Sequence, residues 1–434
     1  MSHSAARPGP SADCDVAIVG AGAAGIGAAR LLVARGMRTV VLEGRDVVGG
    51  RCVTATLRGH PIDLGAHWLH AGDLNPLVPL ARLRGEPLRR APAAGHVVRN
   101  GRFGDRAERR LHAQAFERAD RAFTSAARAP EDRSIASAMP PLGRFGAPIA
   151  ATMALISGRP LHEVSLQDFP SDEFGDNYFV RGGYGAYLRR LAIGLPIRLG
   201  CAVDRIAWRA DGATLSGAFG SVTARAVVVT VPVPVLAAGA VRFEPPLPDP
   251  LVEAAGAFLP GTYEHVILNW PGSPFRGADR LAKLASPSGG LGLMTNIDGS
   301  PFHYLELDHA AARAMPGPHA RARFARDLLR DAFGAAACRS ASVLATTDWL
   351  GDPWSRASWA VVPTGRAAIR TQLAAPAGPL RFAGEATSRH LWGTVGGAWQ
   401  EGEKAAAALA DRLAGPSPDG DSGVDVVPPS SKVP

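Results

Sequence analysis

A glycine-rich turn directly after a short apolar run near the N-terminus strongly limits the folds open to this chain. Residues 16–19, Val-Ala-Ile-Val, have the composition of a buried parallel strand. Gly20, Gly22 and Gly25 then fit the pattern G-x-G-x-x-G at the start of an alanine-rich stretch that ends at Gly36. This order predicts a strand, a tight turn and a helix, the first unit of a dinucleotide-binding α/β domain.

Each glycine of the pattern has its own mechanical role. Gly20 permits the tight turn, Gly22 lets the backbone approach a pyrophosphate, and Gly25 lets helix and strand pack closely. The exposed N–H groups at the helix start, with Ala23 and Ala24 in the first turn, would hold the phosphate charge. The pattern alone does not distinguish NAD from FAD.

The residues that follow favour FAD. Residues 39–42 are predicted to form a second strand, which ends on Glu43, placed to accept hydrogen bonds from the adenosine ribose hydroxyls. An acid there disfavours a 2′-phosphate. Two arginines and a Gly-Gly turn come next, and arginine can neutralise a pyrophosphate that stays bound. The candidate FAD-binding residues in this run are Gly44, Arg45, Gly49, Gly50 and Arg51.

Four separated segments resemble the flavin-containing amine oxidase family, which includes monoamine oxidases, polyamine oxidases and flavin-dependent histone demethylases. They are the run through Arg51, residues 63–70, residues 179–206 with 230–232, and residues 382–395. The similarity covers roughly residues 14 to 413 in the family's order. It implies a two-domain α/β fold, in which a Rossmann-type FAD-binding domain is interleaved with a substrate domain of mixed sheet and helices.

The implied domains are discontinuous. The FAD-binding domain is predicted at residues 13–75, 181–255 and 372–413, and the substrate domain at residues 76–180 and 256–371. The second piece of the substrate domain opens with an alternating strand at residues 263–270. Residues 1–12 and 414–434 are predicted to be disordered tails, rich in Pro, Ser, Asp and Gly.

The resemblance also implies cofactor contacts far from the first glycines. Glu385 would bind ribityl or ribose hydroxyls, although a turn acid that caps a nearby helix is the alternative. Val203 would contact adenine through its backbone. The helix that begins after Gly393 would point its positive end at the flavin's pyrimidine edge. The remaining implied FAD contacts are Gly65, Ala66, His67, Trp68, Trp349, Gly384, Thr394 and Val395.

Aromatic side chains frame the substrate amine in this family. Trp359 stands at the first aromatic position, and Thr394 stands at the second, where polyamine oxidases and demethylases often carry threonine. The segment that contains Trp68 and His70 resembles the polyamine oxidase side of the family, which places both in the implied pocket. The alternative is that such a tryptophan belongs to the core.

One departure from the family pattern concerns reaction with dioxygen. In the phrase Gly-x-x-x-Lys-Val-hydrophobic-Leu, this chain has His265 in place of lysine. The family's lysine holds a water beside flavin N5 and is credited with helping the reduced flavin react with dioxygen. His265 is therefore the catalytic candidate, or else it only fills a strand position. Because histidine is charged below a pKa of about 6.5, the oxygen step is expected to quicken toward pH 6.

These features predict an enzyme with non-covalent FAD that oxidises the C–N bond of a small amine or polyamine. The resemblance implies hydride transfer to flavin N5, release of an imine or aldehyde, and reduction of dioxygen to hydrogen peroxide. Because His265 replaces the family's lysine, the alternative of an amine dehydrogenase that uses another electron acceptor stays open. The same motifs are also compatible with a non-amine oxidase or desaturase of this fold, and with a flavin-binding protein without turnover.

The composition narrows the classes of protein to which this chain can belong. The 434 residues are 46% hydrophobic, enough for one or two substantial cores. The net charge of +8 is mostly arginine, a usage typical of bacteria, and its densest run at residues 102–128 has the spacing of a solvated helix rather than a nucleic-acid patch. The four cysteines show no metal-ligand spacing, and no run of about 18 apolar residues could span a membrane. A cytoplasmic protein without a metal is expected, and a homodimer is compatible with this composition.

Overall fold

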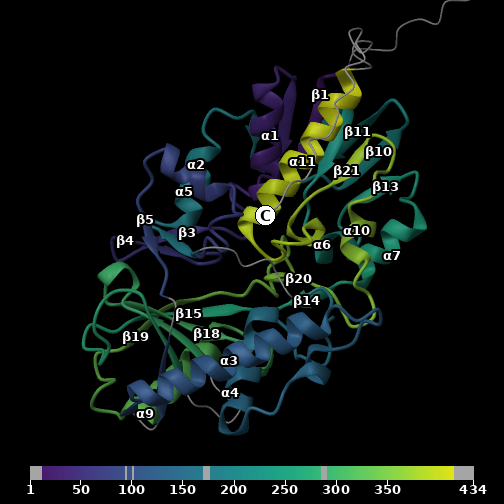
Figure 1. Ribbon diagram of the computed structural model, residues 1–434. Coiled ribbons are helices and arrows are strands. Elements are labelled where there is room, and N and C mark those ends of the chain that lie inside the picture. The colour runs from purple at the N-terminus through teal and green to yellow at the C-terminus, as the bar shows by residue number, and fades with distance from the viewer. Residues whose placement is uncertain (1–11, 93–94, 100–101, 170–175, 285–290, 415–434) are drawn as a thin grey trace, which may run out of the picture.

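The chain is built around two β-sheets, seen in the upper and lower parts of Figure 1. The computed structural model describes residues 12–92, 95–99, 102–169, 176–284 and 291–414. Within this part of the chain, no helix is both long enough and apolar enough to cross a membrane. The mixed α/β fold predicted from the sequence is confirmed.

The first sheet has eight strands in the order β13-β10-β11-β12-β1-β2-β9, and β21 also pairs with β12. Strand β1 runs parallel to both β12 and β2, as a dinucleotide-binding sheet requires. The two strands predicted at residues 16–19 and 39–42 are confirmed as β1 and β2. The strands are β1 (Cys14–Val19), β2 (Thr39–Leu42), β9 (Ile197–Arg198), β10 (Arg205–Arg209), β11 (Gly212–Gly217), β12 (Gly220–Val229), β13 (Arg242–Glu244) and β21 (Leu380–Phe382).

Helices cover both faces of this sheet, so its central strands are apolar on both sides. In β12, Ala226 and Val228 pack in the core beneath α1 (Ala23–Ala34) and α11 (Val395–Ala414). Val227 and Val229 face the opposite core, which contains residues of the three short helices on that side. Those helices are α6 (Val233–Ala237), α7 (Asp249–Ala257) and α10 (Ile369–Leu373).

Small residues let α1 and α11 lie side by side, as Figure 1 shows. A Cβ atom added at Gly402 of α11 would stand 2.0 Å from the carbonyl oxygen of Ala24 in α1. No side chain fits at that distance. The contact joins residues near the two ends of the sequence, and α11 continues through Ala414, which the sequence assigned to the C-terminal tail. Nearly all of both predicted tails lies outside the described residues.

The second sheet has seven strands in the order β19-β15-β18-β17-β16-β6-β7. Its strand β15 confirms the strand predicted at residues 263–270. One face packs against α9 (Pro318–Phe333), and the other face packs against Ile62 and Phe179. The strands are β6 (Gly95–Arg99), β7 (Arg102–Phe103), β15 (Glu264–Asn269), β16 (Arg280–Leu284), β17 (Leu291–Thr295), β18 (Phe302–Leu307) and β19 (Ser342–Thr346).

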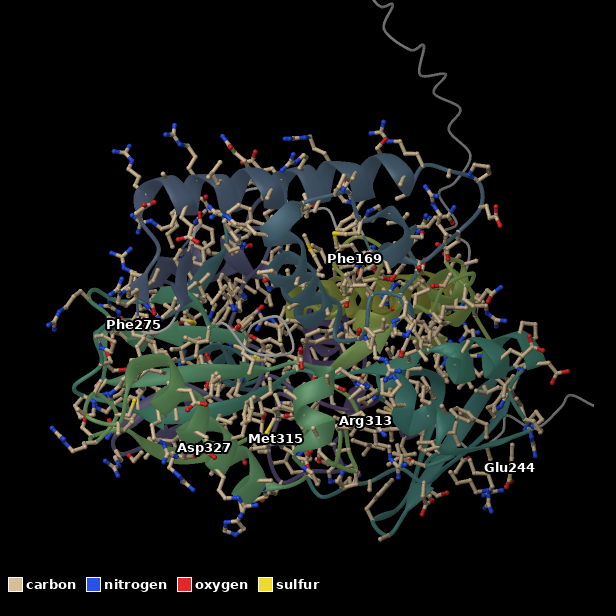
Figure 2. The ribbon with its side chains drawn as sticks, turned by 90° about the horizontal axis from the view of Figure 1, so that it is seen from below. Phe169, Glu244, Phe275, Arg313, Met315 and Asp327 are labelled. Carbon is tan, nitrogen blue, oxygen red and sulfur yellow. The ribbon has the colours of Figure 1, made fainter. Side chains whose placement is uncertain are left out.

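The arginine-rich run at residues 102–128 forms α3 (Arg106–Ala126), which confirms the predicted helix. Asp105 begins it by accepting a hydrogen bond from the backbone N–H of Glu108. Figure 2 shows this helix along one border of the molecule, with its long side chains pointing outward. Its inner face packs on α4. The other helices of this part are α4 (Gly146–Ser157), α8 (His309–Ala314) and α9 (Pro318–Phe333).

Several small elements connect the two sheets. The pair of strands β14 and β20 lies between them in Figure 1. These connecting elements are β3 (Thr54–Leu57), β4 (His60–Asp63), α2 (Leu77–Leu83), β5 (Leu88–Arg90), β8 (Tyr178–Val180), α5 (Tyr184–Leu191), β14 (Leu259–Gly261) and β20 (Trp359–Val361).

The origin of the strands in each sheet supports the interleaved arrangement of the two predicted domains. The domain boundaries stay a prediction. Every strand of the first sheet comes from the three ranges assigned to the FAD-binding domain, and every strand of the second comes from the two substrate ranges. The proposed boundary between residues 371 and 372 falls inside α10, whose apolar side chains pack in the first sheet's core.

Candidate active site

The glycines after β1 form a cradle at the carboxyl end of the sheet. Gly20 has a φ of +101°, and an added Cβ atom would lie 2.7 Å from the hydroxyl oxygen of Thr230. An added Cβ atom at Gly25 would lie 1.9 Å from the carbonyl oxygen of Gly20, so strand and helix pack as closely as predicted. At Gly22, by contrast, an added Cβ atom would meet no atom within 4 Å.

This cradle fits the pyrophosphate of a dinucleotide. Gly22 is the N-cap of α1, and no side chain caps this helix end. The first N–H groups of α1 are thus available to an anion. The predicted Gly-Gly turn lies against the cradle, since an added Cβ atom at Gly50 would stand 3.4 Å from Cα of Gly22. Gly49 and Gly50 both have positive φ, at +117° and +59°.

Glu43 is held at the end of β2 with its carboxylate fixed by two backbone groups. Oε2 accepts a hydrogen bond from the N–H of Ala21 at 2.6 Å, and Oε1 accepts one from the N–H of Arg45 at 2.9 Å. Each oxygen keeps a lone pair that can accept a ribose hydroxyl. The carbonyl oxygen of Glu43 accepts a hydrogen bond from the backbone N–H of Cys201. This bond places the segment just before Val203 beside Glu43.

A tryptophan that the sequence reasoning missed covers this corner. An added Cβ atom at Gly44 would lie 2.3 Å from the ring of Trp354, so a larger residue at position 44 would displace this indole. Trp354 is 41% exposed, which is unusual for so large a side chain. The signal in the sequence is the glycine at position 44, which leaves room for an aromatic ring from a distant part of the chain.

Both arginines predicted near the pyrophosphate have carboxylate partners. Arg45 forms an ion pair with Asp352, and Nη1 of Arg51 lies 3.0 Å from Oε1 of Glu385. Arg51 also donates to the carbonyl oxygen of Ser358 at 3.0 Å. These pairs fix the guanidinium groups beside the cradle, and their assignment to the pyrophosphate stays a prediction.

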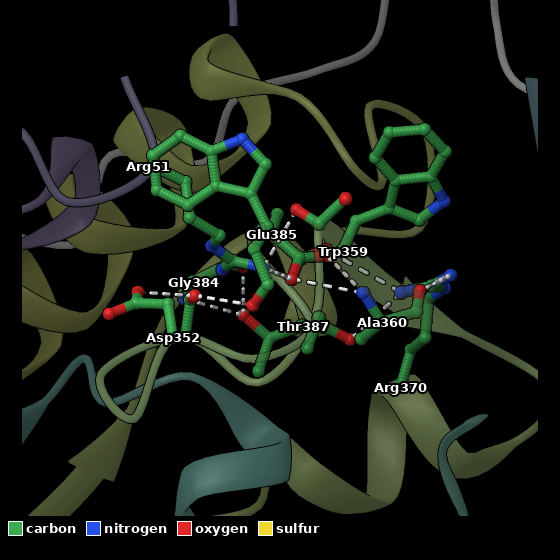
Figure 3. A network of polar contacts seen from close by, with 12 residues as sticks. Arg51, Asp352, Trp359, Ala360, Arg370, Gly384, Glu385 and Thr387 are labelled. Carbon is green, nitrogen blue, oxygen red and sulfur yellow. Dashed lines mark hydrogen bonds and ion pairs between the residues drawn. The ribbon is translucent and has the colours of Figure 1, made fainter. Parts of the chain in front are cut away.

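Glu385 stands at the centre of the polar network in Figure 3. It is buried, and its two carboxylate oxygens lie 3.1 and 3.3 Å from the backbone nitrogen of Ala360 in β20. The carboxylate therefore binds a strand and Arg51, and does not cap a helix. An added Cβ atom at Gly384 would meet no atom within 4 Å.

A pocket opens directly beside this network. It lies between the end of β12 and the turn after β21. Thr230 and Pro232, which the cofactor predictions did not include, line it together with Arg51, Gly384 and Glu385. A small, mostly apolar cavity thus lies next to the Arg51–Glu385 ion pair.

Thr394 caps the N-terminus of α11. Its hydroxyl accepts a hydrogen bond from the N–H of Gly397 at 2.9 Å and donates to the carbonyl oxygen of Leu391 at 2.7 Å. Val395, the first helical residue, is packed in the core near α1. The hydroxyl of Thr394 therefore serves the helix itself, and the position of this helix end relative to the flavin stays a prediction.

Three of the four predicted pocket residues, Trp359, Trp68 and His70, lie along one continuous row of rings, which we call the aromatic row. Trp359 begins it next to Gly393, where an added Cβ atom would lie 3.3 Å from the indole. Its Nε1 donates to the carbonyl oxygen of Ser157 at 3.1 Å, which fixes the ring. Neighbouring ring centroids are 4.7 to 5.9 Å apart. The row runs through Trp359, Tyr263, His265, Tyr304, His67, Trp68 and His70.

Two members of this row were missed from the sequence. Tyr263 lies just before β15, and Tyr304 lies on the neighbouring strand β18, paired in register with Ile267. Their positions follow from strand pairing and from no local motif. Tyr304 packs between His67 and His265, with centroid distances of 4.8 and 4.7 Å. The sheet thereby brings together rings from segments about 240 residues apart.

His265 is in the row, and its environment corrects one expectation. Its Nδ1 lies 3.3 Å from the carbonyl oxygen of Leu64, and its backbone N–H donates to Thr347 at 2.8 Å. Burial lowers the pKa of His265 to about 4, because a charged imidazole would lose its hydration there. The expectation of protonation near pH 6 is wrong, and the ring is neutral at physiological pH.

The segment after β4 joins the cradle to the row. An added Cβ atom at Gly65 would lie 1.9 Å from the carbonyl oxygen of Arg51 and 3.0 Å from the ring of Trp349. Ala66 donates its N–H to the same carbonyl at 3.1 Å. This close approach carries the chain from the Gly-Gly turn directly to His67. The two predicted groups of residues thus adjoin each other in the structure.

A glycine cradle at the carboxyl ends of parallel strands is the arrangement of a dinucleotide-binding protein. The family model described as flavin containing amine oxidoreductase matches residues 23–410, and the chain belongs to this family. Its cofactor is therefore FAD.

Curated relatives and solved structures agree with this family. Polyamine oxidase 2 of Arabidopsis thaliana is 30% identical, over 90% of this chain and 87% of that protein. Lysine-specific histone demethylase 2 of Homo sapiens is 26% identical, over 91% of this chain and 53% of the demethylase. The chain thus spans about half the length of the demethylases it matches. Wild-type putrescine oxidase bound to putrescine superposes with a TM-score of 0.74 at 21% identity, covering 92% of this chain and 99% of that one, which shows the fold.

Proposed function

We propose that this enzyme oxidises the C–N bond of a small amine or polyamine, with FAD bound non-covalently. The observation that carries the proposal is the aromatic row, which runs from Trp359, beside Gly393, into the packed core that contains Tyr304. Similarity to polyamine oxidases supports this substrate class. Bound FAD would supply the acceptor for the hydride that leaves the carbon next to nitrogen.

The residues of this chain would bind and orient both molecules. Gly20, Gly22 and Glu43 would hold the dinucleotide end, and Glu385 the ribityl hydroxyls. Trp359, fixed by its bond to Ser157, would form a rigid wall for the amine. The buried rings would exclude water from the reacting atoms.

The proposed reaction needs no protein base. A neutral amine already has the electron pair that expels hydride, which leaves an imine after loss of one proton. The imine hydrolyses to a carbonyl compound. Overall, the substrate loses two electrons and two protons, and dioxygen takes up both to give hydrogen peroxide. The role of the site is then orientation and desolvation.

A second candidate is an amine dehydrogenase that passes electrons to an acceptor other than dioxygen. The observation that favours it is the neutral state of His265, which supplies no positive charge where the family carries lysine. A cation there would stabilise the negative charge that develops as dioxygen is reduced. Without it, reaction with dioxygen should be slow.

Two half-reactions separate these candidates. The purified yellow protein is mixed anaerobically with butylamine, benzylamine, putrescine and spermidine, and the flavin absorbance is followed. Bleaching identifies an amine-oxidising enzyme. Air is then admitted: recovery within seconds supports the oxidase, and recovery over many minutes supports the dehydrogenase. If no amine in the panel bleaches the flavin, amine oxidation is refuted for these classes.

A further inference from the structure

Trp354 presents an exposed indole beside the predicted binding site for the adenosine ribose. It is the most exposed of the eight tryptophans, at 41%, whereas the other seven are buried or partly buried. A single exposed apolar side chain is common on protein surfaces, so exposure by itself assigns no role to Trp354. The contacts of the indole with the chain next to Glu43 do assign one.

The Glu43 carboxylate and the Trp354 indole both lie against Gly44. Oε1 of Glu43 accepts a hydrogen bond from the backbone N–H of Arg45 at 2.9 Å, so the carboxylate folds back over the residue between them. An added Cβ atom at Gly44 would stand 2.3 Å from Cζ3, 2.6 Å from Cη2 and 3.0 Å from Cε3 of the indole. The benzene ring of the indole therefore lies on the same residue, within reach of a ribose bound to this carboxylate.

The loop that carries Trp354 is held on both sides of the indole. Asp352 forms an ion pair with Arg45, which joins the loop to the chain after β2. Ser355 is buried, and its hydroxyl oxygen lies 2.6 Å from Oδ2 of Asp352. The indole thus has a fixed position, and part of its apolar surface stays in contact with water.

The predicted adenine contact lies beside the same stretch of chain. The carbonyl oxygens of Glu43 and Arg45 accept hydrogen bonds from backbone N–H groups of residues 200–203, at 2.7 and 2.9 Å. Val203 belongs to this segment. Residues 43–45 therefore have the predicted adenine contact and the Trp354 indole as direct neighbours, with the ribose acceptor between them in sequence.

We propose that Trp354 covers the adenosine ribose of bound FAD, and that Gly44 gives the indole the space to do so. The indole would exclude water from the hydrogen bonds between the ribose and Glu43, and such bonds are stronger where water is excluded. Its own exposed surface would be partly covered by the nucleotide. The inference concerns FAD alone, so it stands whichever amine the enzyme oxidises.

The competing role of Trp354 is purely structural, with the indole shielding the ion pair between Arg45 and Asp352 from water. NMR of the holoenzyme separates the two roles. Protein labelled with ¹³C,¹⁵N-tryptophan is loaded with unlabelled FAD, and Trp354→Phe assigns the signals of this ring. Isotope-filtered spectra should show nuclear Overhauser effects between the Trp354 ring protons and ribose or adenine protons.

Trp208 is the control for these spectra. Its Nε1 donates to the carbonyl oxygen of Pro245 at 2.8 Å, and it lies outside the predicted FAD contacts, so it should show no effect to FAD. Effects from Trp354 to isoalloxazine protons alone would place the indole at the other end of the cofactor and overturn the proposal. Effects to no FAD proton would leave only the structural role and overturn it as well.

The affinity for FAD gives the second measurement, by fluorescence titration of the apoprotein. Trp354→Ala should raise the dissociation constant about 5- to 10-fold, because the apolar surface that the ribose covers is lost. Trp354→Phe keeps an aromatic ring in this position and should stay within about 3-fold of the parent. An unchanged constant in Trp354→Ala would contradict the proposal.

Gly44→Ala tests the pairing of the two residues. Gly44 has no positive φ, so alanine suits its backbone, and the conflict is with the indole. The added methyl group displaces the ring, so Gly44→Ala should weaken FAD binding about as much as Trp354→Ala. In the Trp354→Ala protein no indole remains to be displaced, so the second change should cost little. Losses that add in the double variant would show that Gly44 acts independently of Trp354.

Discussion

Arg370 donates two of its N–H groups to the carboxylate of Asp168, at 2.6 Å from Nε and 2.9 Å from Nη2. Its remaining N–H groups reach the carbonyl oxygens of Ala360, Glu385 and Ala386, so every donor of this buried side chain has a partner. Figure 3 shows Arg370 beside Ala360, whose N–H binds the Glu385 carboxylate. Arg370 thus links the loop that contains Asp168 to the backbone around Glu385.

Replacing Arg370 by methionine should lower the free energy of unfolding by about 3 to 5 kcal/mol. The change leaves the Asp168 carboxylate buried without its partner. Urea denaturation measures the loss. Arg330→Met is the matched control, because its ion pair with Asp327 is exposed and should be worth at most about 1 kcal/mol. Equal losses in both variants would contradict the role of the Arg370 pair.

Replacing Glu43 by alanine should weaken FAD retention more than replacing Thr394. Glu43→Ala loses a charged acceptor, at a cost of about 1.5 to 3 kcal/mol, roughly 10- to 100-fold in the dissociation constant. Thr394→Ala keeps its backbone N–H and loses only the helix cap, and Thr394→Ser should behave as the parent. Flavin fluorescence during titration of the apoprotein gives the constants. Equal affinities would remove Glu43 from the cofactor site.

Replacing His265 by lysine should speed recovery of the flavin absorbance by dioxygen and change anaerobic bleaching less. Lysine adds a positive charge where His265 is neutral, and a cation stabilises the charge that forms as dioxygen is reduced. Burial lowers the pKa of such a lysine, so the gain should fall as the pH rises. Stopped-flow spectroscopy resolves both half-reactions.

The unmodified protein supplies the control for that experiment. Because the pKa of His265 is about 4, its reaction with dioxygen should not change between pH 8 and pH 6. A rate that rises toward pH 6, and no longer does so in His265→Gln, would show a charged His265. Identical rates in the parent and the lysine variant at every pH would place His265 away from the oxygen reaction.

The protein should lose stability as the pH falls from about 6.5 to 4. Burial lowers the pKa of His265 and His303 to about 4 in the folded state, whereas the unfolded chain has the ordinary value near 6.5. The unfolded state therefore binds more protons in this interval, and each group removes about 3 kcal/mol by its lower end. Urea midpoints at pH 7.5, 6 and 4.5 should decline, and less steeply in His303→Gln. Parallel declines would mean that His303 titrates normally.

Acid precipitation should release intact FAD into the supernatant. Cys52, which directly follows Arg51, is buried, and its thiol points to the carbonyl oxygen of Ala66 at 3.8 Å. Burial also raises its pKa, which suppresses the reactive thiolate. Absorbance of the supernatant and the pellet measures the partition, with a free FAD standard as control. Yellow colour that stays in the washed pellet would show a covalent link.

Local patterns were enough to predict the cradle and its chemistry. The β-branched run before Gly20, the spacing to Gly25 and the acid at Glu43 each act within a few residues, so the strand, turn and helix follow from backbone sterics and hydrogen bonding. The alternation at residues 263–270 predicted β15 for the same reason. The motif order predicted the family that residues 23–410 match.

Only the tertiary structure decided which side chains meet and which charges they keep. Tyr304 reaches His67 and His265 because β18 pairs with β15, and no local pattern encodes that register. The carboxylate partners of Arg45 and Arg51 come from more than 300 residues away. The neutral state of His265 depends on how deeply the fold buries the ring, because all of its neighbours together exclude water from it.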